Sequence, residues 1–305
     1  MVASNPTRLA CRDRYRVVES PSPYSPDMLA LDNATRLMKR LRITWTQVSL
    51  DEVACAFGRC PFCGPSAFVR LYADSVGVRC IRCFATAVHM SLGFALRSHV
   101  PNLDACSVCE LSARGPLAAH LARHARSVAL SEYFTDISLG AVRGGVRCED
   151  VQHLTYADAS FDVVTHTEVL EHVPDDRRAL AELRRVLRAD GIMLFTVPLH
   201  GRVRTLERAR PCAGSIVHLQ PPAYHRDPLR GGAGILAFRD YGVDIVERLL
   251  AAGFTRAWVE SPPKVAWDHG RNVVIARCSD TTGWRGHRQV GRHAGRGVPV
   301  GLPGG

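Results

Sequence analysis

Residues 146–198, VRCEDVQHLTYADASFDVVTHTEVLEHVPDDRRALAELRRVLRADGIMLFTVP, decide the fold of this 305-residue chain. The stretch holds three short apolar runs, which predict strands at 145–148, 161–165 and 192–197. Between the last two lies an amphipathic segment, 176–188, with leucines on one side and arginines elsewhere, which predicts a helix. Short apolar strands alternating with amphipathic helices indicate a parallel α/β sheet.

The same alternation continues on both sides of this stretch. Upstream, strands are predicted at 105–111 and 127–130, with a helix at 116–124 between them. Downstream, a helix at 241–252 precedes two last strands near 258–260 and 272–277. The whole chain is therefore divided into a disordered N-terminus (1–25), a helical segment (26–55), a cysteine-bearing module with a linker (56–100), an α/β domain (101–278) with an insertion at 199–240, and a disordered basic tail (279–305).

Two Cys-x-x-Cys pairs, Cys60/Cys63 and Cys80/Cys83, predict a metal site. Four thiolates on two turns offer tetrahedral sulfur coordination, which suits Zn²⁺ and leaves no open position for catalysis. Strands expected at 68–72 and 76–79, around a turn at Asp74-Ser75, fit a small zinc ribbon. Two alternatives stay open: free thiols without metal, or a mixed site that uses Cys55 or His89 in place of one cysteine.

The composition shows which broad classes of protein the chain fits and which it does not. With 46% hydrophobic and 22% charged residues, the chain is typical of a soluble globular protein. Its longest apolar run, 88–96, is far shorter than the roughly 20 residues of a membrane-spanning helix. The N-terminus has arginines but no apolar core of a secretory signal, and a transit peptide stays possible. The 11 cysteines are scattered, without the pattern of a secreted disulfide scaffold. We therefore expect a reducing, cytoplasmic location.

The formal charge of +10 lies mostly near the two ends of the chain. The Gly-rich tail after residue 280 contains four arginines and no acidic residue, and the first 16 residues are also rich in arginine. The central body keeps a mild positive excess only. The charge distribution thus leaves a nucleic-acid partner possible without favouring it. The oligomeric state is not indicated by any pattern.

Residues 146–198 resemble the second half of a class I S-adenosylmethionine-dependent methyltransferase domain, of the type 11 kind. The landmarks are an acid after the third strand, Ser160-Phe161-Asp162 opening the fourth, a Glu171-His172 pair, and a helix leading to a Gly turn and the fifth strand. With weaker support, the resemblance extends over about 103–278. It implies a Rossmann-like, doubly wound, mostly parallel seven-stranded sheet with S-adenosylmethionine as cofactor.

The resemblance also assigns cofactor-binding roles, at the strand ends where open α/β sheets bind ligands. Asp150 would accept a hydrogen bond from the adenine amino group, and the Val151 amide would meet a ring nitrogen. Glu132, after the second strand, would bind the ribose hydroxyls. Thr167 and Glu168 would lie near the methionine end. The ordinary alternative for each carboxylate is a capping or surface role.

The loop after the first strand departs from the family pattern. An acid-x-Gly-x-Gly-x-Gly run is expected there, and this chain reads Glu110-Leu-Ser-Ala-Arg-Gly-Pro116. Glu110 matches the acid, Ser112 replaces the first glycine, Ala113 is small, and only Gly115 remains. Arg114 would resist a positive φ. The absence of Gly-x-Gly-x-x-Gly also argues against a nicotinamide-dependent Rossmann enzyme.

The insertion supplies candidates for the methyl acceptor site. Its segment HLQPPAYHRDP at 218–228, together with GILAF from Gly234, resembles methyltransferases associated with glycans and small metabolites. His225 and His172 are the candidate bases, because neutral imidazole can take a hydroxyl proton near pH 7; structural hydrogen bonding is the alternative for both. We expect O-methylation of a small molecule or glycan. The alternatives are rRNA or tRNA methylation, which a basic ribbon face (Arg59, Arg70, Arg79 and Arg82) would support, and an inactive methyltransferase-like binding protein.

Overall fold

The computed structural model describes residues 53–71, 77–199, 201–226, 234–264, 266–267 and 270–280. The predicted disordered N-terminus, nearly all of the predicted helical segment, the Asp74-Ser75 turn and the basic tail from residue 281 lie outside these residues. Among the helices of the described ranges, none is long and apolar enough to cross a membrane.

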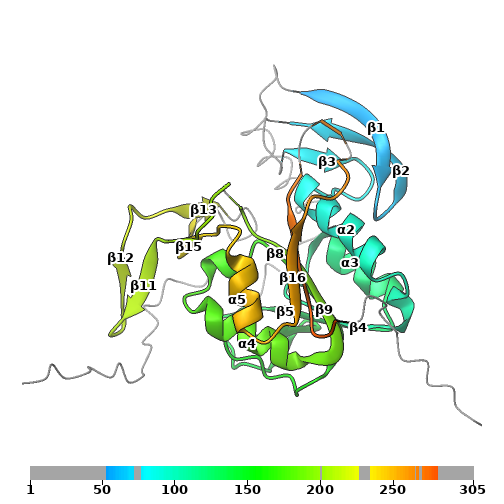
Figure 1. The fold of residues 1–305 in the computed structure, drawn as a ribbon. Coiled ribbons are helices and arrows are strands. Elements are labelled where there is room, and N and C mark those ends of the chain that lie inside the picture. The colour runs from blue at the N-terminus through cyan, green and yellow to red at the C-terminus, as the bar shows by residue number, and fades with distance from the viewer. Residues whose placement is uncertain are drawn as a thin grey trace, which may run out of the picture.

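A mixed sheet forms the centre of the molecule (Figure 1). Its strand order is β16-β17-β9-β8-β4-β5-β7-β6. The pairs among β9, β8, β4, β5 and β7 are parallel, whereas β16, β17 and β6 join antiparallel. The strands are β4 (Ser107–Glu110), β5 (Ser127–Glu132), β6 (Val142–Arg143), β7 (Val146–Cys148), β8 (Phe161–Thr167), β9 (Leu187–Thr196), β16 (Arg256–Glu260) and β17 (Val273–Arg277).

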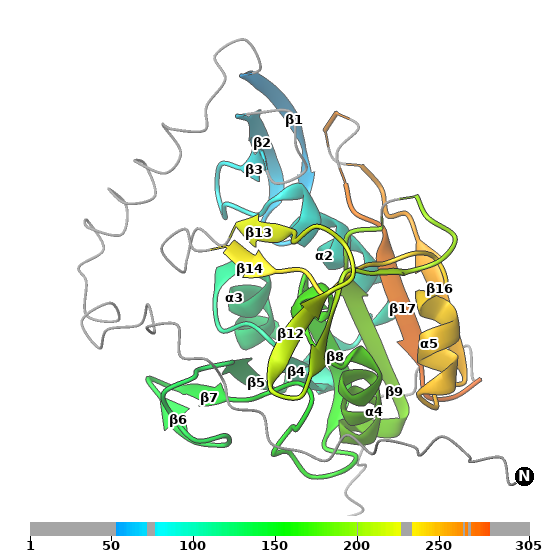
Figure 2. The same ribbon diagram turned by 90° about the vertical axis from the view of Figure 1, so that its left-hand side faces the viewer.

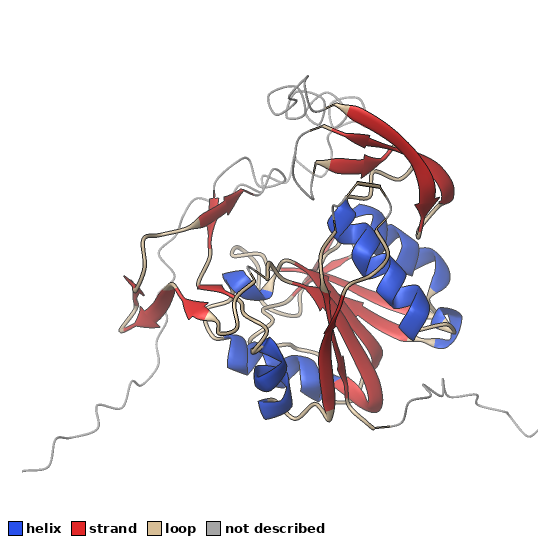
Figure 3. Ribbon diagram, turned by 45° about the horizontal axis from the view of Figure 1, so that its top comes forward, coloured by secondary structure: helices blue, strands red, loops and turns tan. Residues whose placement is uncertain are grey.

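Helices cover both faces of this sheet, as doubly wound topology requires (Figure 3). On one face, α2 (Ala87–His99) and α3 (Gly115–His124) pack with strand residues such as Val108 and Ile275. On the other face, α4 (Asp176–Val186) and α5 (Ile245–Ala251) pack against Val164 and Phe195. The chain runs outward from β4 to β5 and β7, then returns to β8 beside β4. The strand order therefore reverses between β4 and β8, which is the place where open sheets bind ligands.

The described sheet has eight strands instead of the predicted seven. The extra strand is β6, a two-residue edge strand that pairs with β7 through a tight hairpin. Arg143 anchors this hairpin, since its guanidinium lies 2.7 Å from the Asp136 carboxylate and 4.2 Å above the Phe134 ring. The link between β5 and β7 thus forms a hairpin and contains no helix.

Two predicted helix boundaries were wrong. The helix expected over 176–188 ends at Val186, because β9 already begins at Leu187 and pairs with Phe161. A register shift follows, in which Val163 pairs with Ile192. The helix expected from residue 241 begins at Ile245, because Tyr241 forms a bridge with Leu199 at the base of the insertion.

The cysteine module is a three-stranded antiparallel sheet of β1 (Ala54–Cys60), β2 (Gly64–Arg70) and β3 (Val78–Cys80). It rests on α2 through Phe62, which approaches so closely that a Cβ on Gly93 would lie 2.7 Å from its ring. Arg97 of the same helix donates to the Pro61 carbonyl at 3.1 Å. Helix α2, in the stretch predicted to be helical or a linker, therefore packs against both the module and the central sheet.

The described residues of the insertion form three two-stranded antiparallel sheets. The insertion leaves the central sheet after β9 and returns to it before α5, so both of its ends lie at the carboxyl edge of the parallel strands. The pairs are β10 (Leu206–Glu207) with β15 (Arg239–Asp240), β11 (Ala209–Cys212) with β12 (Ser215–His218), and β13 (Tyr224–Arg226) with β14 (Gly234–Leu236). Figure 2 shows β12, β13 and β14 of the insertion in front of the central sheet.

Candidate functional site

The predicted cofactor residues gather at the carboxyl edge of the parallel strands. Glu110, Glu132 and Thr167 are the last residues of β4, β5 and β8, and Asp150 lies two residues beyond β7. Because these strands are parallel neighbours, their ends share one edge of the sheet on either side of the strand-order reversal. The topology therefore brings together residues that come from four separate strands.

Glu110 is buried at this edge, with 1% of its surface exposed. Its carboxyl group is hydrogen bonded to the Thr165 hydroxyl of the neighbouring strand β8. Burial raises the pKa of Glu110 to about 8, with a further contribution from the charge of Glu132 and an opposing one from the Thr165 hydrogen bond. In this structure the Glu110 side chain joins β4 to β8, and its predicted contact with the cofactor stays a prediction.

The loop after β4 adopts its turn without strain at Arg114. Arg114 is extended, with φ −134° and ψ 160°, so the expected resistance to a positive φ does not arise. The positive φ, +95°, falls on Gly115, which is the one glycine that the loop retains. The Ser112 hydroxyl accepts from the Arg114 amide at 3.4 Å, and the Ala113 amide donates to the Glu132 carboxylate at 3.2 Å. The atypical sequence thus still forms an ordered loop that leads into α3.

Asp150 lies in a turn that follows β7. Its Oδ1 accepts hydrogen bonds from the backbone amide and the side-chain amide of Gln152, at 2.9 and 3.1 Å. The side chain is 22% exposed, while the neighbouring Val151 is buried. The Asp150 carboxylate is therefore held by its own turn and still reaches the surface of the edge.

Thr167 is the last residue of β8, and Glu168 follows it with a strained backbone. Glu168 has a φ of +51°, which is uncommon for a residue with a side chain. Its amide donates to the Thr196 carbonyl of β9 at 2.9 Å, and its carboxylate lies 3.5 Å from the Arg271 guanidinium. Strained backbone of this kind concentrates at functional sites.

Glu171, His172 and His225, which we call the Glu–His cluster, lie just beyond this point. Glu171 and His172 belong to η4 (Leu170–His172), directly after β8, whereas His225 comes from β13 of the insertion. The Glu171 Oε1 lies 3.8 Å from His172 Nε2 and 3.9 Å from His225 Nδ1. The two imidazole rings are 4.8 Å apart between centroids and almost perpendicular. The structure thus brings together the two histidines that the sequence suggested as bases.

Glu171 is the most unusual member of the cluster. It is 1% exposed, and among the described residues neither carboxylate oxygen has a hydrogen-bond partner. Burial and the nearby charge of Glu168 raise the pKa of Glu171 well above its ordinary value. Sequence reasoning treated this residue only as part of a family landmark, although its place next to His172 was the available signal.

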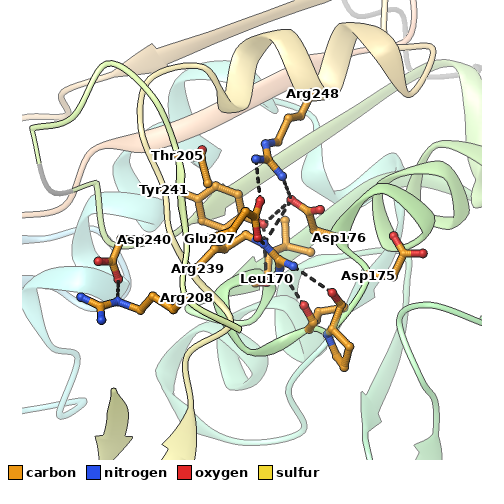
Figure 4. Close-up of polar contacts among 12 residues, drawn as sticks. Leu170, Asp175, Asp176, Thr205, Glu207, Arg208, Arg239, Asp240, Tyr241 and Arg248 are labelled. Atoms are coloured by element: carbon orange, nitrogen blue, oxygen red, sulfur yellow. Dashed lines mark hydrogen bonds and ion pairs between the residues drawn. The ribbon is translucent and has the colours of Figure 1, made fainter. Parts of the chain in front are cut away.

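Arg239 of β15 fixes the turn that carries Glu171 and His172 (Figure 4). Its guanidinium is 3% exposed and donates to the carbonyls of Leu170, Val173 and Pro174 at 2.9, 2.6 and 2.9 Å. It also lies 3.2 Å from the Glu207 carboxylate. No sequence signal pointed to Arg239, because it stands in an insertion that resembled a loop.

Further contacts attach the insertion to the same turn. Arg248 of α5 donates to both Asp176 and Glu207 at 2.8 Å, and the Tyr241 hydroxyl donates to Asp176 at 2.9 Å (Figure 4). The Phe238 amide donates to the Glu171 carbonyl at 2.8 Å. The position of the Glu–His cluster is therefore determined by the segment that closes the insertion.

The four cysteines form a second cluster, in the N-terminal module. The Sγ atoms of Cys60 and Cys83 are 3.6 Å apart, those of Cys63 and Cys80 are 3.5 Å apart, and all four lie within 4.8 Å of one another. Tetrahedral zinc with Zn–S bonds of about 2.3 Å needs separations of about 3.8 Å, so the four thiolates fit a structural Zn²⁺. Neither Cys55 nor His89 is part of the cluster.

Local hydrogen bonds favour the thiolate form of Cys80, whereas burial raises the pKa of Cys63 to about 11 and raises that of Cys83 as well. Although burial alone would raise the pKa of Cys80, hydrogen bonds from the Ser66 hydroxyl and backbone amides lower it to about 7. The Ser66 oxygen lies 3.1 Å from the Cys80 sulfur. Arg82 donates to the carbonyls of Cys63 and Pro65 at 2.8 and 3.0 Å, which braces the first turn. A thiolate-forming sulfur in a braced turn is what metal binding requires.

Comparison with known proteins agrees with this geometry. Residues 112–195, which run from the loop after β4 to the end of β9, match the model of a methyltransferase domain family. Over these residues the chain matches a methyltransferase domain, and this family implies S-adenosylmethionine as the cofactor. Its family model spans the strand ends of β5, β7 and β8, and thus includes Glu132, Asp150 and Thr167.

Two curated relatives are demethylmenaquinone methyltransferases. The protein from Thermobifida fusca is 37% identical over 94 residues, which are 28% of this chain and 40% of the relative. The one from Renibacterium salmoninarum is 34% identical over 105 residues, or 29% of this chain and 44% of that protein. This chain therefore spans less than half the length of the curated relatives that it matches.

Among solved structures, an S-adenosylmethionine-dependent methyltransferase from Mesorhizobium loti is 16% identical, with a TM-score of 0.39. The match covers 60% of this chain and 95% of that one. A methyltransferase from Thermotoga maritima, described as a possible histamine N-methyltransferase, is 18% identical, with a TM-score of 0.40 over 63% of this chain and 90% of that one.

Proposed function

We propose that this chain is an S-adenosylmethionine-dependent methyltransferase that methylates a hydroxyl group of a small molecule or glycan. The observation that carries the proposal is the placement of Glu132 and Asp150 at the carboxyl ends of β5 and β7, inside the segment that matches the methyltransferase domain family. Carboxylates at these strand ends face the crevice in which open α/β sheets hold nucleoside-containing ligands.

The residues present fit the cofactor. S-adenosylmethionine supplies an electrophilic methyl group on a sulfonium sulfur when it is bound. Asp150 would accept from the adenine amino group with the Val151 amide beside it, and Glu132 would accept from the ribose hydroxyls. The loop from Ser112 to Gly115, with Ala113 between, lets backbone approach the cofactor, and Thr167 with Glu168 would adjoin its methionine end. The Ala113–Glu132 hydrogen bond aligns this loop with the ribose-binding carboxylate.

The Glu–His cluster is suited to the acceptor. Methyl transfer is an in-line displacement, so alignment of the acceptor oxygen is the main requirement. A hydroxyl acceptor must also lose its proton. His172 Nδ1 lies 2.9 Å from the Leu236 carbonyl, so the neutral ring carries its proton there and presents Nε2 as an acceptor. His225 lies beside it, and together they provide a place for that proton at the same sheet edge.

The alternatives are less well supported. For RNA methylation, two arginines of the ribbon face are already engaged, because Arg82 donates to backbone carbonyls and the Arg70 guanidinium lies 5.4 Å above the Trp267 ring. Salt-dependent RNA binding would favour that alternative. The alternative of an inactive binding protein depends on the loop after β4, which lacks most of the glycines of the family pattern. Gly115 is retained there and supplies the positive φ that this loop adopts.

Calorimetric titration with S-adenosylmethionine and S-adenosylhomocysteine tests the proposal. We expect micromolar binding, and a loss of at least tenfold in affinity in Asp150→Ala, because one charge-assisted hydrogen bond is worth about 1.5 kcal/mol or more. Asp104→Ala is the matched control, since Asp104 is exposed at the opposite, amino end of β4. No binding by folded wild-type protein would overturn the proposal in favour of an inactive binding protein.

Equal binding by wild type and Asp150→Ala would instead show that the cofactor roles are wrongly assigned. Methyl transfer from radiolabelled cofactor is then measured on hydroxyl-bearing small molecules and oligosaccharides, with RNA as the competing acceptor class. Transfer to RNA alone would replace the proposed acceptor by the nucleic-acid alternative.

A further inference from the structure

The Glu–His cluster has the composition of a metal site. Glu171 contributes one carboxylate, and His172 and His225 contribute one imidazole each, with all ligand atoms within 4.8 Å of one another. Two imidazoles and one carboxylate are a ligand set that binds divalent transition metals and leaves coordination positions open. The cysteine cluster is different in kind, because its four thiolates close the coordination sphere of a structural ion.

The Glu171 carboxylate supplies an independent reason to expect a cation. It is 1% exposed, and neither oxygen has a hydrogen-bond partner among the described residues. A buried carboxylate is costly unless it is paired or coordinates a metal. Oε1 is almost equidistant from His172 Nε2 and His225 Nδ1, at 3.8 and 3.9 Å, so it points between the two rings.

The surroundings of His172 match those of a metal ligand. Its Nδ1 lies 2.9 Å from the Leu236 carbonyl, which fixes the proton there and directs Nε2 toward Glu171. Metal-binding histidines almost always donate their second ring N–H to a carbonyl or carboxylate in this way. Arg239 holds the backbone of the same turn through the carbonyls of Leu170 and Val173.

The distances from Glu171 Oε1 to the two histidine nitrogens allow an ion to bind if the three side chains move slightly closer together. Bonds of about 2.0–2.2 Å in tetrahedral geometry place ligand atoms about 3.3–3.6 Å apart, a few tenths of an ångström closer than the 3.8 and 3.9 Å between Glu171 Oε1 and the two nitrogens. His225 stands on β13, which pairs only with the short strand β14 in the described sheets. Such a two-stranded element can move toward η4 more readily than the central sheet can.

We propose that Glu171, His172 and His225 bind a divalent transition metal ion of the zinc class, with an open position for the oxygen of the methyl acceptor. This inference rests on the proposed function. With the ion bound, Glu171, His172 and His225 would serve as its ligands, and the lowered pKa of an ion-bound hydroxyl would let its proton go to solvent water in place of a histidine. The acceptor oxygen would then form the new O–CH₃ bond as the C–S bond of the sulfonium breaks, and the electron pair of that bond would remain on sulfur in the neutral thioether.

Metal content of the full chain tests the proposal without using activity. Purified protein is dialysed against buffered free Zn²⁺ and its zinc is measured by mass spectrometry. We expect two zinc ions per chain in the wild type and one in Glu171→Gln and His225→Gln, which keep the cysteine cluster intact. His124→Gln is the matched control, because His124 is an exposed histidine on α3, and it should retain two.

Cobalt identifies which cluster holds each ion. When Co²⁺ is added to protein whose cysteine cluster already holds zinc, we expect d–d absorption without the thiolate-to-cobalt charge-transfer band. Glu171→Gln should lose this signal or weaken the affinity at least tenfold. Its folding is checked by its melting temperature with zinc in the cysteine cluster alone, which should not fall, because the lost carboxylate had no hydrogen-bond partner among the described residues. Further Zn²⁺ added to such protein should raise that temperature in the wild type and not in Glu171→Gln.

One zinc ion per chain in the wild type, with no cobalt signal beyond the cysteine cluster, would overturn the metal site. That outcome would leave the proposed methyltransferase function intact if the cofactor still binds. Conversely, two metal ions without cofactor binding would overturn the proposed function while showing that the metal site exists. The two failures are therefore distinguishable on one protein sample.

Discussion

The cysteine cluster and the Glu–His cluster both gather metal-ligating side chains, yet they are built in opposite ways. Each pair of cysteines belongs to one tight turn, so the ligands of each half are neighbours in the sequence, and one hairpin joins the two halves. The Glu–His cluster joins η4 of the central domain to β13 of the insertion, and a third segment around Arg239 holds them in place. We infer that the first cluster depends on its own module and the second on the whole domain.

The largest effect is expected from Cys80→Ser. Removing one thiolate should release the structural zinc and unfold the β1–β3 module, because metal binding supplies on the order of 10 kcal/mol to such small modules. Zinc content and hydrogen exchange over 54–70 measure this. Cys55→Ser is the control, since Cys55 is exposed and outside the cluster. Full zinc content and unchanged protection in Cys80→Ser would contradict a metal-dependent module.

Arg239→Ala tests whether the Glu–His cluster depends on distant support. The substitution removes three hydrogen bonds to the turn at 170–174 and leaves Asp176 and Glu207 with one arginine partner fewer. Losing one partner of a buried ionic network costs about 3–5 kcal/mol. Urea unfolding should show this loss, while exposed Arg210→Ala on β11 should change little. Equal stability of the two variants would show that the Glu–His cluster does not depend on Arg239.

His166 makes the stability of the central domain, which holds the Glu–His cluster, sensitive to acid. It lies fully buried in β8, stacked on Phe195, and burial lowers its pKa to about 3. The unfolded chain takes up this proton near pH 6.5 and the folded chain does not, so stability is lost as the pH falls below 6.5. Relative to His166→Leu, the wild type should lose about 2 kcal/mol of unfolding free energy between pH 8 and pH 5.

The measurement is urea unfolding of both proteins over that pH range. Comparing the two variants cancels the opposite contribution of Glu110, whose raised pKa of about 8 makes the folded state gain stability as the pH falls. His218→Leu is the control, because His218 is exposed on β12. Parallel pH curves for wild type and His166→Leu would show that the buried imidazole does not resist protonation.

The smallest effect is expected in the loop after β4. Gly115→Ala should weaken binding of S-adenosylmethionine about fivefold to tenfold, because a φ of +95° costs a residue with a side chain about 1 kcal/mol or more. Arg114→Gly should leave the affinity within about twofold, since Arg114 is already extended. Calorimetry distinguishes the two. A marked gain in affinity in Arg114→Gly would restore the view that arginine strains this loop.

Much of the central sheet could be predicted, because its strands and helices are local patterns of apolar residues. Two boundaries were wrong where tertiary contacts decided them. Helix α4 ends at Val186 because Leu187 already pairs with Phe161 of β8, and α5 starts late because Tyr241 bridges Leu199. The hairpin of β6 was missed as well, since its Arg143–Asp136 ion pair leaves no periodic signal.

By itself, the sequence determined the α/β alternation, the family of the domain, and the four cysteines, because each of these depends on spacing along the chain. Only the tertiary structure placed His225 beside Glu171 and His172, and only it showed that Arg239 supports their turn. The physical reason is the range of the interactions. Turn geometry and periodic burial act between neighbours in the sequence, whereas a buried carboxylate between two histidines exists only after distant segments have packed together.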